Sequence, residues 1–204
     1  MADDTKREQI LDALQRLLER KNIQSISVNE IAQEADMGKS SIYYYFRTKE
    51  EILEALIERN YKEPLAVTGN LVDQRDVSVF ARMAKMFQVC KESALMFARE
   101  STRQISIAPS ELALLREKCM KYLIAELKPQ LTELIRQGIV NGELEFAYPE
   151  AMAEIALIVL TIKMDNTLAP AKGEGEDETM RGLIELLEKG TNSSRGTFDF
   201  LSVF

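Results

Sequence analysis

The sequence contains no histidine and only two cysteines, Cys90 and Cys119. Histidine is the commonest general base and a frequent zinc ligand, so its absence argues against Ser-His and Cys-His catalysis and against most zinc sites. The two cysteines lie far apart without a CxxC spacing, and we expect buried, reduced thiols. The sequence therefore predicts no enzyme, no metal and no cofactor; a helical enzyme is the least favoured alternative.

Long apolar runs are also missing. The longest, residues 155–162, is far shorter than the roughly 20 residues that span a bilayer. The first nine residues are too polar for a secretory signal. With 46% hydrophobic and 29% charged residues, the 204-residue chain has the composition of a globular protein. We expect a soluble cytoplasmic protein with no membrane partner.

Positive charge is scarce, and the net charge is −7. Residues 1–49 hold eight basic and eight acidic residues, so the excess of acidic residues lies entirely after residue 49. A neutral N-terminal part permits nucleic-acid binding through a local patch but does not by itself indicate it. The acidic remainder weakly favours a cationic or neutral apolar ligand over an anion.

Apolar residues recur at helical spacing along almost the whole chain, which predicts an all-α fold without strands. We expect Pro64 to end the fourth helix or to follow it, and Gly190 to form the C-cap of the last. The predicted helices cover about 6–20, 28–35, 39–46, 49–61, 77–106, 112–137, 149–168 and 179–189.

Residues 27–49, SVNEIAQEADMGKSSIYYYFRTK, carry the most specific pattern. They predict two short helices joined by the turn 36–38, a helix-turn-helix whose second helix can lie in a major groove of DNA. The S/T-x-x-E form of a capping box occurs at residues 27–30 and again at 48–51, marking two helix starts.

The second short helix has side chains suited to DNA. Ile42 and Phe46 supply its buried side, so Tyr43 and Tyr44 must point largely elsewhere. Tyrosines offer hydroxyl donors to phosphates and ring surface to thymine methyl groups. Lys39 and the two serines that follow it occupy the first turn, where backbone amides face outward. DNA binding is favoured over tyrosines that merely pack.

The stretch IAQEADMGKSSIYYYFRTKEEIL resembles the signature of the TetR family of repressors, in which an aromatic-rich YxYF segment precedes a K-E-x-L helix. The resemblance covers roughly residues 6–57. It implies an N-terminal three-helix helix-turn-helix DNA-binding domain (1–49) and a helical ligand-binding and dimerisation domain (50–204). It also implies a homodimer that binds an inverted-repeat operator in double-stranded DNA and releases it when a small-molecule effector binds.

Carried over from the family, the residues expected to contact DNA are Ser27, Lys39, Ser40, Ser41, Tyr43, Tyr44, Tyr45 and Lys49. Two positions depart from the family pattern. The turn has Asp36 where the family usually has glycine; because Asp tolerates a left-handed backbone, we expect the turn to survive. Tyr45 stands where histidine is common.

Two alternatives stay open at this point. The helix-turn-helix could serve only as the scaffold of a protein-interaction module, in which case Lys39 and Tyr44 would be dispensable for binding nucleic acid. A DNA-binding protein of this kind could also activate transcription instead of repressing it.

The helix predicted over 149–168 is apolar over too wide an arc for a simple surface helix. It is buried either within one subunit or against a twofold-related copy. In the TetR family the last two long helices form a four-helix bundle across the dimer axis, and the helices near 149–168 and 179–189 match that position.

Flexible and aromatic side chains in the second domain suit an adaptable apolar effector cavity, although each could equally fill the core. Asp165 and Asn166 could orient a ligand or lie at the dimer rim. The apolar C-terminal segment 191–204 is expected to pack back on the body or on the partner. The candidate pocket residues are Met83, Phe87, Phe97, Met120 and Met164.

Overall fold

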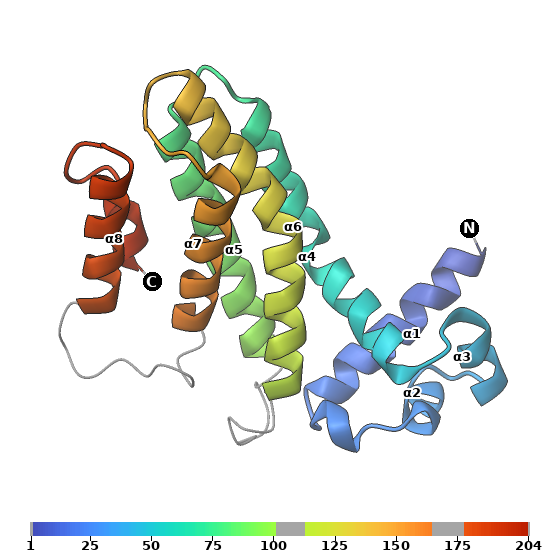
Figure 1. The fold of residues 1–204 in the computed structure, drawn as a ribbon. Helices are drawn as coiled ribbons and strands as arrows, with labels where there is room; N and C mark the ends of the chain where they lie inside the picture. Colours follow the sequence, from blue (N-terminus) through green and yellow to red (C-terminus); the bar gives the residue numbers. More distant parts are fainter. Residues whose placement is uncertain (1, 101–112, 165–177, 204) are drawn as a thin grey trace. The chain divides into compact units, whose positions relative to one another are not determined.

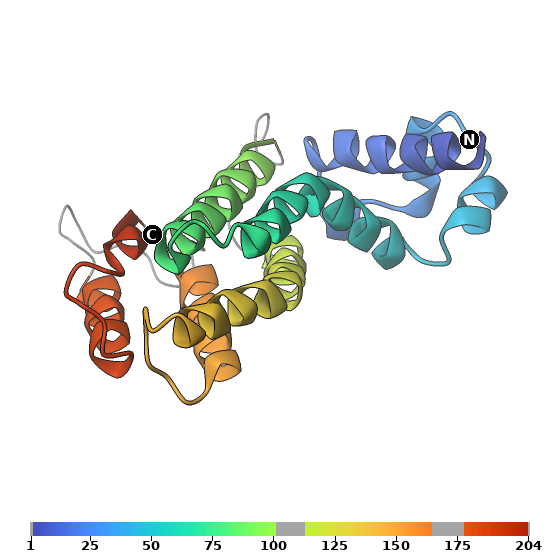
Figure 2. The same ribbon diagram turned by 90° about the horizontal axis from the view of Figure 1, so that it is seen from above.

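The computed structural model describes residues 2–100, 113–164 and 178–203, and every regular element in these ranges is helical, which confirms the all-α prediction (Figures 1 and 2). No helix in these ranges is long and apolar enough to cross a membrane. The elements are α1 (Ala2–Leu18), η1 (Ile23–Ser25), α2 (Val28–Glu34), α3 (Lys39–Tyr45), α4 (Lys49–Asp73), α5 (Val79–Glu100), α6 (Ala113–Val140), α7 (Pro149–Met164), α8 (Glu178–Gly190) and η3 (Asp199–Val203).

The chain divides into two compact units. The first, here the head unit, comprises Met1–Glu63 and Ser93–Tyr122, and the second, the body unit, comprises Pro64–Glu92 and Leu123–Phe204. Helices α1, α2 and α3 lie entirely in the head unit, whereas α4, α5 and α6 each contribute residues to both units.

Helix α4 is longer than the sequence predicts, and the expectation that Pro64 ends it is wrong. Pro64 lies inside the helix, which continues to Asp73. Proline removes one backbone N–H donor and crowds the preceding turn. Tyr61 and Leu65, on either side of it, are both buried. Packing of the helix on both sides of the proline outweighs the local cost of the lost hydrogen bond.

Residues with a left-handed backbone conformation follow α6 and α8. Gly142 (φ 72°) closes α6, where the amide of Glu143 donates to the carbonyl of Gly138. At the end of α8, Gly190 is the last helical residue, and Asn192 (φ 52°) takes the left-handed conformation. The predicted C-cap role therefore belongs to Asn192, because asparagine tolerates this conformation better than most residues.

A buried arginine joins three helices of the body unit. Arg82 of α5 is 1% exposed, and its Nη1 donates to the carbonyl oxygen of Val72 (3.1 Å) and to Oε1 of Gln137 (2.7 Å). Its charge lies at the C-terminal end of α4, where the helix dipole favours a cation. The Gln137 side chain in turn donates to Val72 O (3.2 Å), so α4, α5 and α6 share one polar network.

The C-terminal segment packs on the body unit, as expected. Phe198 is buried and meets the Phe80 ring edge-on, with centroids 5.3 Å apart. Phe200 of η3 stacks on Phe87 with centroids 6.2 Å apart, so the two contacts attach η3 and the residue before it to α5.

Both cysteines are buried free thiols, as predicted. Burial disfavours the charged thiolate and raises the pKa of Cys90, in the body unit, to about 12. Burial likewise raises the pKa of Cys119, in the head unit, to about 12.

Phe198→Ala should lower the free energy of unfolding by about 3–5 kcal/mol, because it removes a fully buried ring and leaves a cavity against α5. Chemical denaturation followed by circular dichroism measures the change. Val140→Ala is the control, since Val140 is 84% exposed and its truncation should be nearly neutral. A loss below about 1 kcal/mol for Phe198→Ala would show that the C-terminal segment does not pack as described.

Candidate nucleic-acid interface

Helix α2 begins with the capping box that the sequence predicts. The Ser27 hydroxyl accepts from the amide of Glu30 (3.2 Å), while the Glu30 carboxylate accepts from the amide of Ser27 (2.8 Å). The predicted box at Thr48 is only half formed. Thr48 accepts from the amide of Glu51 (3.1 Å), but the Glu51 carboxylate reaches one residue further back, to the amide of Arg47.

Asp36 makes the turn between α2 and α3. Its φ is 52°, and the amide of Met37 donates to the carbonyl of Ala32 (2.9 Å), which closes α2 with a left-handed cap. The turn therefore survives the replacement of glycine by aspartate, as expected. Aspartate is one of the few residues other than glycine that adopt this conformation at modest cost. The turn between α2 and α3 can therefore be as short as a helix-turn-helix requires.

Helix α3 has one buried and one exposed side. Ile42 and Phe46 are 0% and 5% exposed, whereas Tyr43 and Tyr44 are 48% and 75% exposed. The ammonium of Lys39 lies 5.9 Å from the centroid of the Tyr43 ring, one turn further along the exposed side. The exposed side thus joins a cation to two large aromatic rings, a combination that can bind both phosphates and base edges.

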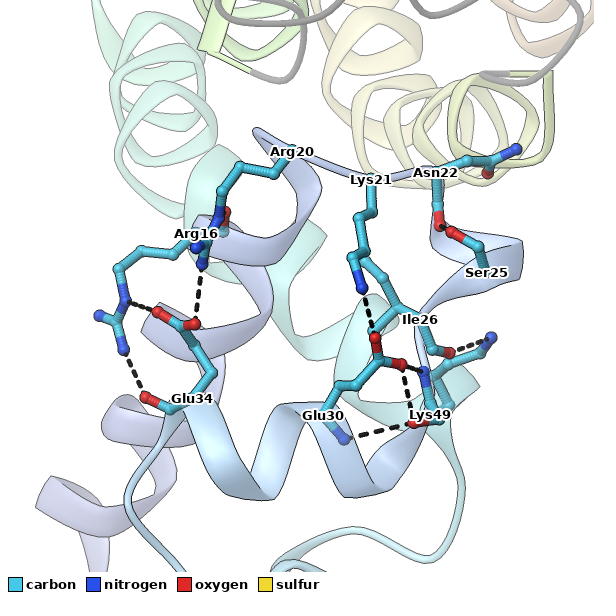
Figure 3. Close-up of polar contacts among 10 residues, drawn as sticks. Arg16, Arg20, Lys21, Asn22, Ser25, Ile26, Glu30, Glu34 and Lys49 are labelled. Carbon is cyan, nitrogen blue, oxygen red and sulfur yellow. Dashed lines mark hydrogen bonds and ion pairs between the residues drawn. The ribbon is translucent and has the colours of Figure 1, made fainter.

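Three cations of the head unit are paired with α2 (Figure 3). Arg16 and Arg20, at the end of α1 and just beyond it, both bind the Glu34 carboxylate at 2.7 Å, and Lys21 binds Glu30. The Arg16 and Arg20 hydrogen bonds lower the pKa of Glu34. The Lys21 hydrogen bond, followed by those from Ser27, lowers the pKa of Glu30 to about 2. These pairs hold α2 against α1.

Lys49, the first residue of α4, is half-buried, and its ammonium donates to the carbonyl oxygens of Ile23 and Ile26, both at 2.8 Å. Figure 3 shows the contact with Ile26. The DNA contact that the resemblance implies for Lys49 would have only the third N–H of this ammonium. Nothing in the local sequence marks this use of the lysine, because its partners lie more than 20 residues earlier in the chain.

The other residues expected to contact DNA lie on the exposed side of α3 or at the start of α2. Tyr45 is half-buried and meets the Tyr44 ring edge-on, with centroids 5.0 Å apart. Ser41 is also half-buried, and the exposed members of the set are Ser27, Lys39, Ser40, Tyr43 and Tyr44.

The candidate effector residues are distributed over both units. Met83 and Phe87 are buried in the body unit, and Met120 is half-buried in the head unit. The side chains of Phe97 and Met164 lie outside the described residues, as do Asp165 and Asn166.

A cavity of about 1100 Å³ lies in the body unit between α8 and the C-terminal segment. Charged side chains dominate its lining, so it does not have the apolar character expected of the effector pocket. The charged residues are Arg181, Glu185, Glu188, Lys189, Arg195 and Asp199.

Helix α7 carries apolar residues on two sides. Met152 and Leu160 are buried in the body unit, whereas Ile155, Ile158 and Ile162 are 57%, 41% and 40% exposed. The three isoleucines follow one another at spacings of three and four, so they form one stripe along the helix. This stripe, here the isoleucine stripe, is a large apolar surface to leave in water.

The sequence profile of the family described as "Bacterial regulatory proteins, tetR family" matches residues 10–56. These residues contain α2 and α3 together with parts of α1 and α4. Residues 10–56 are thus a TetR-family segment. The HTH-type transcriptional regulator EthR of Mycolicibacterium smegmatis is 40% identical over 70 residues, which are 34% of this chain and 32% of that protein. An HTH-type transcriptional regulator of Lactococcus lactis is 34% identical over 80 residues, 39% of this chain and 41% of its own length.

The similarity to these curated relatives thus spans about a third to two fifths of their length. The fold similarity reaches further. The solved structure of SmeT, the repressor of the Stenotrophomonas maltophilia multidrug efflux pump SmeDEF, superposes with a TM-score of 0.65 at 17% identity. It covers 94% of this chain and 92% of SmeT, so the body unit also has a helical fold similar to that of SmeT.

Glu30→Gln should remove a pH-dependent part of the stability. The folded pKa of Glu30, about 2, lies below its ordinary value of 4.5, so its contribution is complete above pH 4.5 and is lost as the pH falls toward 2. The difference in melting temperature between wild type and Glu30→Gln should be largest at neutral pH and shrink toward pH 2. Glu63→Gln, on exposed α4 surface, controls for the lost charge and should follow the wild-type curve. A pH-independent difference for Glu30→Gln would refute the assignment.

Proposed function

We propose that the chain is a DNA-binding transcriptional repressor that acts in the cytoplasm and leaves its operator when a small-molecule effector binds. The observation that carries the proposal is the exposed side of α3, where Lys39, Tyr43 and Tyr44 face solvent while Ile42 and Phe46 anchor the helix. The match of residues 10–56 to the TetR family supports the same function.

In this proposal α3 lies in the major groove. Tyrosine rings contact thymine methyl groups and their hydroxyls donate to phosphates, while the Lys39 ammonium reaches a base edge or phosphate. Ser27 at the start of α2, with Ser40, Ser41 and Tyr45, completes the contact surface. Because Arg16, Arg20 and Lys21 are already paired with the glutamates of α2, base and ring contacts must contribute much of the specificity.

We propose a homodimer built on α7 and α8. The isoleucine stripe on α7 supports it, because burial against a second copy removes three large apolar side chains from water. Two heads held at a fixed spacing of roughly 34–36 Å would read the two halves of an inverted repeat, converting two weak contacts into one specific site.

The effector is proposed to bind among the apolar residues of the helical domain that follows the helix-turn-helix. Met83 and Phe87 of the body unit are the buried candidates. Methionine adapts to ligands of different shapes, which suits a regulator that responds to apolar small molecules.

Selection of binding sites from random duplex DNA tests the DNA-binding proposal. Wild type should enrich an inverted repeat, and Lys39→Ala/Tyr44→Ala should lose the enrichment because it removes the cation and the most exposed ring of α3. Lys62→Ala/Tyr148→Ala is the matched control: both residues are exposed, neither lies on the helix-turn-helix, and enrichment should persist. If wild type enriches nothing at low salt, the interaction-module alternative takes the place of the repressor.

Ile155→Asp/Ile158→Asp should convert the dimer to a monomer, because it places two charges in the proposed interface. Sedimentation equilibrium measures the mass. Val140→Asp, on exposed surface outside α7, should leave the dimer intact. If the double variant retains the dimer mass, the interface does not lie on the isoleucine stripe.

A further inference from the structure

Lys49 connects the two ends of the helix-turn-helix. It follows the α3–α4 link directly, and one of its carbonyl partners, Ile26, immediately precedes Ser27, the N-cap of α2. A single ammonium therefore ties the residue before α2 to the residue after the α3–α4 link. The hydrogen bond between Lys49 and the Ile26 carbonyl thus closes a loop that contains residues 27–48.

Both carbonyl partners belong to buried residues. Ile23 and Ile26 are 3% and 2% exposed. The carbonyl of Ile23 also accepts from the amide of Ile26 at 3.3 Å, within the 3₁₀ turn η1, whereas for the Ile26 carbonyl Lys49 supplies the short hydrogen bond. Without the ammonium, this carbonyl would lose a charge-assisted partner in a place with little access to water.

The position of Lys49 is unfavourable for α4 itself. A cation in the first turn opposes the helix dipole, and Glu50 and Glu51 in the same turn are the residues that the dipole favours. The two carbonyls offer a reason for a lysine there, since a flexible stem with three donors can reach both oxygens at once.

We infer that Lys49 is a positioning residue for DNA recognition: it fixes the start of α2 relative to the start of α4 and thereby sets the presentation of α3. The inference rests on the proposed function and departs from the direct DNA contact that the family resemblance implies for this lysine. In the positioning role the ammonium stays on the two carbonyls whether or not DNA is bound.

The salt dependence of operator binding separates the two roles. A residue that neutralises a phosphate contributes roughly one unit per subunit to the slope of log affinity against log salt concentration. Lys49→Met keeps the stem and removes the donors. It should weaken binding to the selected duplex by about tenfold or more and leave the slope unchanged. Lys39→Met, the matched control on exposed α3, should flatten the slope.

Lys49→Arg keeps the charge but replaces the compact ammonium with a planar fork. Lys49→Arg should bind the duplex more tightly than Lys49→Met but less tightly than wild type, because a planar guanidinium does not match two carbonyls of one turn. A phosphate contact, in contrast, would tolerate arginine fully. The positioning role would be overturned if Lys49→Met flattens the salt-dependence slope as Lys39→Met does. It would also be overturned if Lys49→Met leaves the DNA affinity unchanged.

Acetylation of the wild-type protein tests the two hydrogen bonds of Lys49 without any variant, first in the free protein and then with DNA. With limiting acetic anhydride and mass spectrometry, Lys49 should react several-fold more slowly than Lys39 and Lys62 in the free protein, and DNA should protect only Lys39 further. Equal rates for Lys49 and Lys62 would overturn the inference. If wild type binds no duplex, the proposed function and the positioning role both fail, while the acetylation rates still report on the carbonyl contacts.

Discussion

Helices of seven residues do not hold their shape alone, and both helices of the helix-turn-helix are of this length. Their geometry depends on what fixes their ends. Ser27 and Glu30 close the start of α2, Asp36 closes its end, and Phe46 anchors the end of α3 in the core. The exposed tyrosines can hold a defined position only because these neighbouring residues are constrained.

This constraint uses up much of the positive charge of the head unit. Arg16, Arg20 and Lys21 are engaged by the two glutamates of α2, and Lys49 by two backbone carbonyls. Residues 1–49, which have no net charge, therefore have fewer cations available to phosphates than their composition suggests. Binding that relies on few phosphate contacts depends less on salt and more on shape and base contacts.

Local patterns made the fold class and the exposed side of α3 predictable. The S-x-x-E signature located Ser27 as a cap, and the spacing of Ile42 and Phe46 identified the buried side. Features that arise from contacts between distant residues were not predictable. Pro64 ends a helix by local rules but lies inside α4, where packing decides. Likewise, no local signal places the Arg82 guanidinium against Val72 and Gln137.

The two buried thiols have a practical consequence. With pKa values of about 12, Cys90 and Cys119 carry almost no thiolate at neutral pH, and the thiolate is the species that alkylating reagents attack. A cysteine introduced at an exposed position would therefore react far faster than either native thiol. Fluorophores or spin labels can be attached to such a site in the otherwise native sequence, so distances between labelled positions become measurable without first replacing any cysteine.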